Sequence, residues 1–105
     1  MKPIYYAVIF TSLLTDETKG YNEIAETMES LAKQQPGFLG VESARKKLGI
    51  TVSYWKSLDA IKNWRANIDH QVAQKLGKEK FYSWYKVRIC KVEREYEFSA
   101  FVHKN

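Results

Sequence analysis

Hydrophobic residues in this 105-residue chain follow two different periods, and the order of these periods constrains the fold more than any other feature. Segments that alternate and are rich in β-branched and aromatic residues predict strands, whereas segments with helical periodicity predict amphipathic helices. The predicted strands are residues 4–11, 38–45, 50–55 and 81–98, and the predicted helices are residues 21–35 and 57–76. The order is therefore strand, helix, strand, strand, helix, strand.

Local signals support these boundaries. The pair Pro36-Gly37 is a typical stop after the first helix. Ser57 is a suitable N-cap for the second helix, and Asp59 suits the positive end of its dipole. Asn67 offers a point at which this second helix would break into two shorter pieces. The turn between the middle strands is expected at residues 47–49, which makes those strands a hairpin.

The βαββαβ order predicts a ferredoxin-like α+β fold. Right-handed crossovers place both helices on one face of a four-stranded antiparallel sheet. The chain is short enough for one hydrophobic core, so we expect a single domain over residues 1–105, with its core at about 4–98.

Aromatic side chains lie on both sides of the predicted strands, although two helices can cover only one side. Tyr54 is opposite in phase to Trp55, and Trp84 is opposite in phase to Tyr85. An exposed sheet face with this many rings is unusual for a monomer. We therefore expect a homodimer in which two sheets pack face to face, with a cavity between each sheet and its helices.

The composition indicates a folded protein without a membrane segment. At 45% hydrophobic and 28% charged residues, the chain is typical of a folded domain rather than a disordered one. No apolar stretch approaches the length of a membrane helix, and the start lacks the pattern of a signal peptide. Cys90 is the only cysteine and has no partner within the chain. We expect a cytoplasmic protein without membrane contact.

The net charge of +5 is spread along the chain. The tightest basic cluster, residues 45–47, is interpreted as a solvated hairpin tip, and nucleic-acid binding is not expected. RNA-recognition domains share the βαββαβ order, and residues 37–41, GFLGV, faintly resemble their aromatic motif. That stretch lies on the second strand rather than the third and lacks the preceding base, which argues against this alternative.

The chain resembles the antibiotic biosynthesis monooxygenase superfamily of dimeric α+β barrels. The resemblance covers roughly residues 4–98 and rests on QPGFLGVESAR, on ITVSYWKSLDAIKNW, on a histidine shortly afterwards and on an aromatic final strand. It implies the barrel fold and dimerisation. It leaves the activity open, because the superfamily includes cofactor-free oxygenases of aromatic polyketides, haem-degrading enzymes and members without an assigned reaction.

The first of these activities implies a reaction site with one histidine and several aromatic walls. His70 is the candidate for proton transfer, since His103 lies in the basic tail. Trp64 matches the helix tryptophan of active members, and Tyr54 and Trp84 are further candidates for holding a flat ring. Each has a simpler interpretation: Trp64 as core, Tyr54 and Trp84 as dimer packing, and His70 as a surface residue unless the helix breaks at Asn67.

Two further residues share the phase of Trp84 on the last strand. Arg88 is a candidate to bind an anionic substrate as a buried cation, or to form an ion pair at the dimer interface, for example with Glu42. Cys90 is expected to be a small buried hydrophobe rather than a nucleophile.

Haem binding is the main alternative function. Haem-degrading members use an asparagine at the end of the first strand, where this chain has Phe10, Thr11 and Ser12. The histidine that binds the haem iron in those members would fall near Gln74 of this chain. His70 could bind the iron only if the second helix were shifted. No Cys/His cluster predicts another metal site. A non-catalytic dimer that binds a small hydrophobic molecule is the third candidate function. The function that we predict from the sequence is a cofactor-independent monooxygenase that acts on a small aromatic or quinol-like molecule.

Overall fold

The computed structural model of the protein describes residues 4–69 and 81–100. Its elements are β1 (Tyr5–Leu14), α1 (Tyr21–Lys33), β2 (Phe38–Arg45), β3 (Leu48–Trp55), α2 (Leu58–Asp69) and β4 (Tyr82–Val92). Their order is the predicted βαββαβ, and each described element lies within a few residues of its predicted bounds except at the end of β4.

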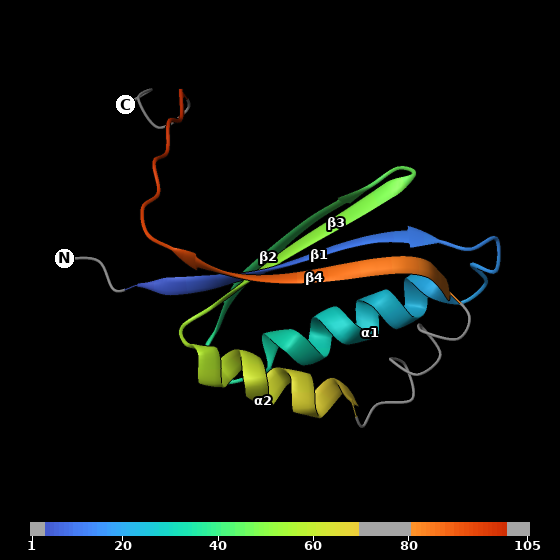
Figure 1. The fold of residues 1–105 in the computed structure, drawn as a ribbon, viewed down its shortest axis with the longest axis horizontal. Coiled ribbons are helices and arrows are strands. Elements are labelled where there is room, and N and C mark those ends of the chain that lie inside the picture. Colours follow the sequence, from blue (N-terminus) through green and yellow to red (C-terminus); the bar gives the residue numbers. More distant parts are fainter. Residues whose placement is uncertain (1–3, 70–80, 101–105) are drawn as a thin grey trace.

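The four strands form one antiparallel sheet in the order β2-β3-β1-β4. Both helices lie on the same side of this sheet (Figure 1), which we call the helix side, and the opposite side is called the open side. The ferredoxin-like α+β prediction is therefore confirmed. β1 is a central strand of this sheet, paired with β3 on one edge and with β4 on the other.

The helix boundaries follow the predicted signals. The backbone N–H of Ala60 donates to Ser57 Oγ at 3.0 Å, which is the expected N-cap bond of α2. Asp59 lies in the first turn, as predicted. Of the two alternatives at Asn67, the continuous helix is the one observed, because α2 runs through this residue to Asp69. Residues 70–76 of the predicted helix lie outside the described part of the chain.

The core of the described residues lies where α2 and the end of α1 cover β3. Trp55 at the end of β3 is fully buried among Ala32, Ala60 and Ile61, and the rings of Phe38 and Trp64 pack against this cluster. Two alanines face the tryptophan because helices approach a sheet closely only where their side chains are small. Alternation along the strand thus places Trp55 in the core and its neighbour Tyr54 on the open side.

Gly37 connects α1 to β2 in a backbone conformation that L-residues with a side chain rarely adopt, with φ at 85°. A Cβ atom added there would lie 2.7 Å from Ala60 Cβ. We therefore expect Gly37→Ala to lower the free energy of unfolding by about 1–3 kcal/mol, combining αL strain with a core clash. Urea unfolding measures this loss. Gly20→Ala is the matched control, because Gly20 has a similar φ of 87° but open space around it; an equal loss in both variants would contradict the contribution from the clash.

The last strand is shorter than predicted. Its expected span reached Phe98, but β4 ends at Val92. The reason is that Val92 pairs with Tyr5, the first residue of β1, so beyond this point no described strand lies beside the chain. Residues 93–100 continue without secondary structure and leave the sheet on its open side (Figure 1). We call them the C-terminal arm.

Candidate functional site

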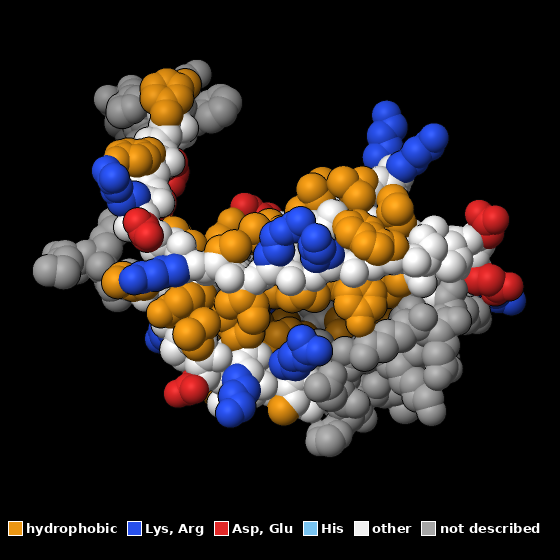
Figure 2. Space-filling view, in the orientation of Figure 1, with side chains coloured by type: hydrophobic (Ala, Val, Ile, Leu, Met, Phe, Trp, Pro, Cys, Tyr) orange, Lys and Arg blue, Asp and Glu red, His pale blue; other side chains and the backbone are white. Residues whose placement is uncertain are grey.

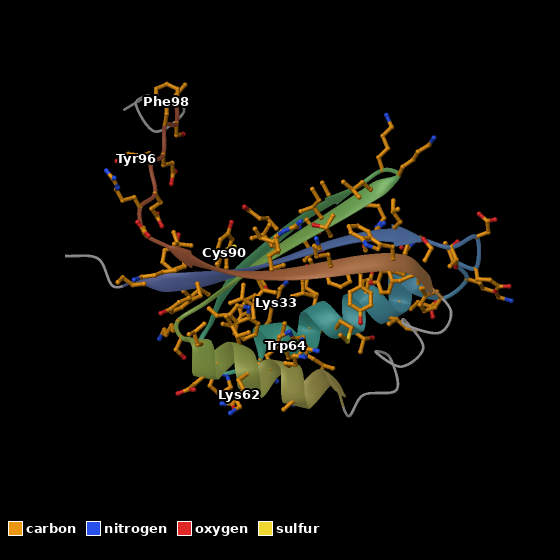
Figure 3. The ribbon with its side chains drawn as sticks, in the orientation of Figure 1. Lys33, Lys62, Trp64, Cys90, Tyr96 and Phe98 are labelled. Carbon is orange, nitrogen blue, oxygen red and sulfur yellow. The ribbon has the colours of Figure 1, made fainter. Side chains whose placement is uncertain are left out.

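The predicted site residues do not share one face of the sheet. Trp64 projects from α2 into the layer between helix and sheet (Figure 3) and stacks on Trp55. Tyr54 pairs with Ala7, and Trp84 pairs with Leu13, which places both residues on the open side. The sheet therefore separates Trp64 from Tyr54 and Trp84, and one pocket within a single chain does not contain all three.

Trp64 belongs to an aromatic group on the helix side. Its ring lies 6.0 Å from the ring of Trp55 at an interplanar angle of 24°, and Trp55 meets Phe38 edge to face at 5.4 Å. The indole N–H of Trp55 donates to Ser53 Oγ at 2.9 Å. Trp64 itself is only half-buried. It contributes to the core, as the simpler interpretation holds, and keeps part of its ring available to a planar ligand.

A second aromatic group lies at the other end of the helix side. Phe10, Tyr21, Phe81, Tyr82 and Tyr85 meet there at ring-centroid distances from 5.3 to 6.0 Å. Burial is the main cause that raises the pKa of Tyr82, and the neighbouring Tyr21 hydroxyl adds to it. The phenol of Tyr82 is therefore neutral at ordinary pH, which argues against a role as a base.

Arg45 enters this second group, and the sequence did not predict that. Its guanidinium donates to the hydroxyl and carbonyl oxygens of Ser12, which is fully buried, and lies 5.6 Å from the ring centre of Tyr21. The interpretation of residues 45–47 as a solvated tip is thus correct for the exposed Lys46 and Lys47 and wrong for the half-buried Arg45.

A glycine creates the space for this arginine. The Arg45 side chain crosses the backbone of Gly49, and a Cβ on that residue would collide with the guanidinium. The sequence contains one sign of this contact, an arginine four positions before a glycine in a strand. The pattern alone does not show that Arg45 turns inward while the two adjacent lysines remain exposed. Gly49 pairs with Ser12 and Trp55 pairs with Tyr6, so about 20 Å of strand separates Arg45 from the tryptophan group.

On the open side, Tyr54 donates its hydroxyl to Glu42 Oε2 at 2.9 Å. Burial, followed by this hydrogen bond, raises the pKa of Tyr54. Arg88 is exposed rather than the buried cation considered above, and Cys90 is half-buried rather than buried. Their common phase with Trp84 is confirmed, since all three pair with odd-numbered residues of β1.

Glu42 and Arg88 occupy one transverse row of the sheet. Glu42 pairs with Val52, Val52 with Ile9, and Ile9 with Arg88. Three strand spacings of about 4.8 Å separate the two edge strands by about 14 Å, too far for an ion pair within one chain. The acidic and basic members of this row therefore lie at opposite edges of the open side.

His70, the predicted proton-transfer residue, lies outside the described residues, as does His103. Among the residues that are described, no three of the types His, Cys, Asp and Glu gather closely enough to hold a metal ion. None of the helices in residues 4–69 and 81–100 is long and apolar enough to cross a membrane.

Comparison with known proteins identifies the family. Residues 4–76 match the family described as antibiotic biosynthesis monooxygenase. The chain belongs to this family. It is 53% identical over 96 residues to the protein YqjZ of Bacillus subtilis, covering 90% of this chain and 84% of that one. The resemblance inferred from the strand and helix motifs is confirmed.

Several solved structures share the fold of this chain. SnoaB, a cofactor-independent oxygenase from Streptomyces nogalater, has a TM-score of 0.72 at 10% identity, covering 90% of this chain and 97% of its own. PA3566 from Pseudomonas aeruginosa has a TM-score of 0.69 at 14% identity, covering 91% and 99% of the two chains. At these identities the likeness establishes the arrangement of sheet and helices.

Proposed function

We propose that this family member is a monooxygenase that oxidises a small aromatic or quinol-like molecule without a metal, haem or flavin. The observation that carries the proposal is the half-buried Trp64, stacked on a fully buried tryptophan in the layer between sheet and helices. A flat substrate ring packs well on an indole whose own position is fixed from behind. SnoaB, which shares the fold, is a cofactor-independent oxygenase.

The reaction needs only a proton acceptor and a dry aromatic wall. An anthrone-type substrate that loses a ring CH₂ proton becomes a carbanion, which donates an electron to O₂; the resulting radical pair combines into a peroxide. Protonation gives a hydroperoxide, and loss of water leaves a carbonyl, so that substrate and O₂ yield quinone and H₂O. In this proposal His70 accepts the first proton and returns one to the peroxide. Excluding water strengthens the interactions that stabilise the anion.

We further propose that the protein works as a homodimer with its open side as the interface. Four of the apolar side chains there, Leu13, Leu48, Ile50 and Trp84, are between 39% and 45% exposed in the single chain. Hydrophobic side chains also gather along β4 at the front of the molecule (Figure 2). Of the exposed ones, Trp84 lies on the open side, whereas those that pair with even-numbered residues of β1 lie on the helix side, namely Tyr85, Val87 and Ile89. Because the sheet separates Tyr54 and Trp84 from Trp64, this proposal assigns them to dimer packing and Arg88 to an interface ion pair with Glu42 of the second copy.

Oxygen consumption tests the activity directly. Purified protein is mixed with dithranol, an anthrone, and separately with 1,4-dihydroxynaphthalene. O₂ uptake and formation of the oxygenated products, an anthraquinone and 2-hydroxy-1,4-naphthoquinone, are followed against the spontaneous oxidation. We expect protein-dependent acceleration that persists after dialysis against EDTA. Binding of either compound, seen as quenching of tryptophan fluorescence, without acceleration would instead support the non-catalytic binding protein.

A haem titration tests the remaining alternative function, which is haem binding. No observation on the described residues favours haem. Haem-degrading members of the superfamily use an asparagine near the end of the first strand, where this chain has Phe10, Thr11 and Ser12. We expect no saturable Soret band. Stoichiometric binding that is lost in His70→Ala would overturn the cofactor-free proposal.

A further inference from the structure

One transverse row on the helix side of the sheet has small side chains in its middle and large ones at its ends. Arg45 on β2 pairs with Gly49 on β3. Gly49 pairs with Ser12 on β1, and Ser12 pairs with Tyr85 on β4. Because β2 and β4 are the two edge strands, Arg45 and Tyr85 start from opposite edges of the sheet. The glycine and the serine between them leave room above the sheet for what the two large side chains enclose.

The guanidinium of Arg45 lies over this middle and keeps most of its hydrogen-bonding capacity. It donates to the carbonyl oxygen of Ser12 at 3.4 Å and to Ser12 Oγ, and it lies 5.6 Å from the ring centre of Tyr21. A guanidinium has five N–H donors, so these two bonds leave three. Within residues 4–69 and 81–100, no carboxylate forms an ion pair with Arg45.

Packing alone does not explain a cation at this position. A half-buried charge without an acidic partner is costly, because burial removes part of its hydration and nothing of opposite charge replaces it. At the other end of the sheet, the row through Phe38, Trp55 and Tyr6 is filled by aromatic rings instead. A cation kept among apolar side chains in spite of this cost is typical of a group that binds an anion.

The polar groups around Arg45 are hydroxyls. Tyr21 at the start of α1 and Tyr82 at the start of β4 meet edge to face at 6.0 Å. Burial is the largest cause that raises the pKa of Tyr82, and the charge of Arg45 acts against it, so the guanidinium lies close to this phenol. No aspartate or glutamate of the described residues is among the groups that shift this pKa. The surroundings of Arg45 therefore suit an anionic ligand.

Apolar surface remains accessible beside the cation. Tyr85 stacks on Phe10 at 5.3 Å with an interplanar angle of 30°, and Tyr82 meets Phe10 edge to face at the same distance. Tyr85 is nevertheless 37% exposed, and Val87, the next residue on this face of β4, is 38% exposed. A flat ring gains contacts on such a surface.

From this arrangement we infer a binding site for a small aromatic acid, in which Arg45 binds the carboxylate and Tyr85 and Val87 support the ring. The planar guanidinium matches a carboxylate with two parallel N–H bonds. The aromatic body distinguishes this ligand from an inorganic anion, which would use the cation alone. About 20 Å of strand separates Arg45 from the tryptophan group, so the site is distinct from the surface proposed for oxidation and does not depend on that reaction.

Calorimetry with a matched pair of ligands tests the site. The compounds 2-naphthoate and 2-naphthamide have the same ring system and nearly the same shape, but only the first is charged at neutral pH. We expect 2-naphthoate to bind saturably and 2-naphthamide to bind at least about tenfold more weakly, because the charge-assisted bonds are lost. Equal affinities, or no binding of 2-naphthoate, would overturn the inference.

A variant of Arg45 ties the binding to this residue. Arg45→Met keeps an unbranched side chain and removes the guanidinium, so we expect the affinity for 2-naphthoate to fall at least about tenfold while that for 2-naphthamide changes little. Lys46→Met is the matched control, because it removes one positive charge from the exposed neighbour. It should change the affinity by less than about twofold. Equal losses in the two variants would reveal general attraction to the basic hairpin tip and contradict the site.

Arg45→Lys keeps the test decisive if Arg45→Met does not fold, which circular dichroism and urea unfolding show. Lysine retains the charge but lacks the fork of parallel donors, so the affinity for 2-naphthoate should still fall. Arg45→Lys with the affinity of the wild type would exclude the paired N–H bonds and overturn the assignment. Failure of this site would leave the oxygenase proposal intact, because dithranol carries no carboxylate and its oxidation is measured separately.

Discussion

A His70→Ala variant is expected to lose oxidation of dithranol by about 10²–10⁴-fold in kcat, the usual contribution of one general acid-base residue. The substrate carbanion is the electron donor in the proposed reaction, so removing the proton acceptor suppresses the step on which electron transfer depends. Binding should change little, since the aromatic contacts with Trp64 remain. Steady-state O₂ uptake gives kcat, and quenching of tryptophan fluorescence gives the affinity for the substrate.

The pH profile makes the role of His70 specific. A histidine accepts a proton only in its neutral form, so activity of the wild type should rise with pH as the imidazole loses its proton. His103→Ala is the matched control, because it removes the other histidine and should leave kcat unchanged. Normal turnover by a folded, dimeric His70→Ala protein would remove the proposed proton transfer from this residue, whether or not the protein is an oxygenase.

Much of the fold could be predicted because each element carries its own periodic signal. Trp55 and Tyr54 occupy opposite faces as their phases require, and Ser57 caps α2 as its position requires. The end of β4 could not be predicted in this way. Residues 93–98 have the composition of a strand, but whether a strand forms depends on a neighbour, and the neighbour is not encoded in the local pattern.

The candidate site could be predicted less well, because a site depends on which faces meet. The alternation of side chains along the last strand correctly placed Trp84, Arg88 and Cys90 on one face. It did not show that the sheet separates these residues from Trp64. Arg45 shows the same limit. Two lysines beside it are exposed, and only the space left by Gly49 across the sheet explains why its side chain turns inward.

Trp55→Ala is expected to lower the free energy of unfolding by about 3–5 kcal/mol, a large share of the 5–15 kcal/mol typical of a domain. The indole is fully buried, packs on Phe38 and Trp64, and satisfies its N–H through Ser53 Oγ. Truncation removes these contacts and leaves a cavity between β3 and α2. Urea unfolding at a fixed protein concentration measures the change, because the stability of a dimer, as proposed for this chain, would depend on concentration.

Two matched variants separate the causes of that loss. Trp55→Phe keeps most of the apolar volume and loses the bond to Ser53, so it should cost clearly less than Trp55→Ala. Leu58→Ala removes a large side chain that is 54% exposed on the same helix layer and should cost under about 0.5 kcal/mol. If Trp55→Ala and Leu58→Ala proved equally mild, Trp55 would not be the centre of the core, and Trp64 would lose the fixed support on which its role as a substrate wall depends.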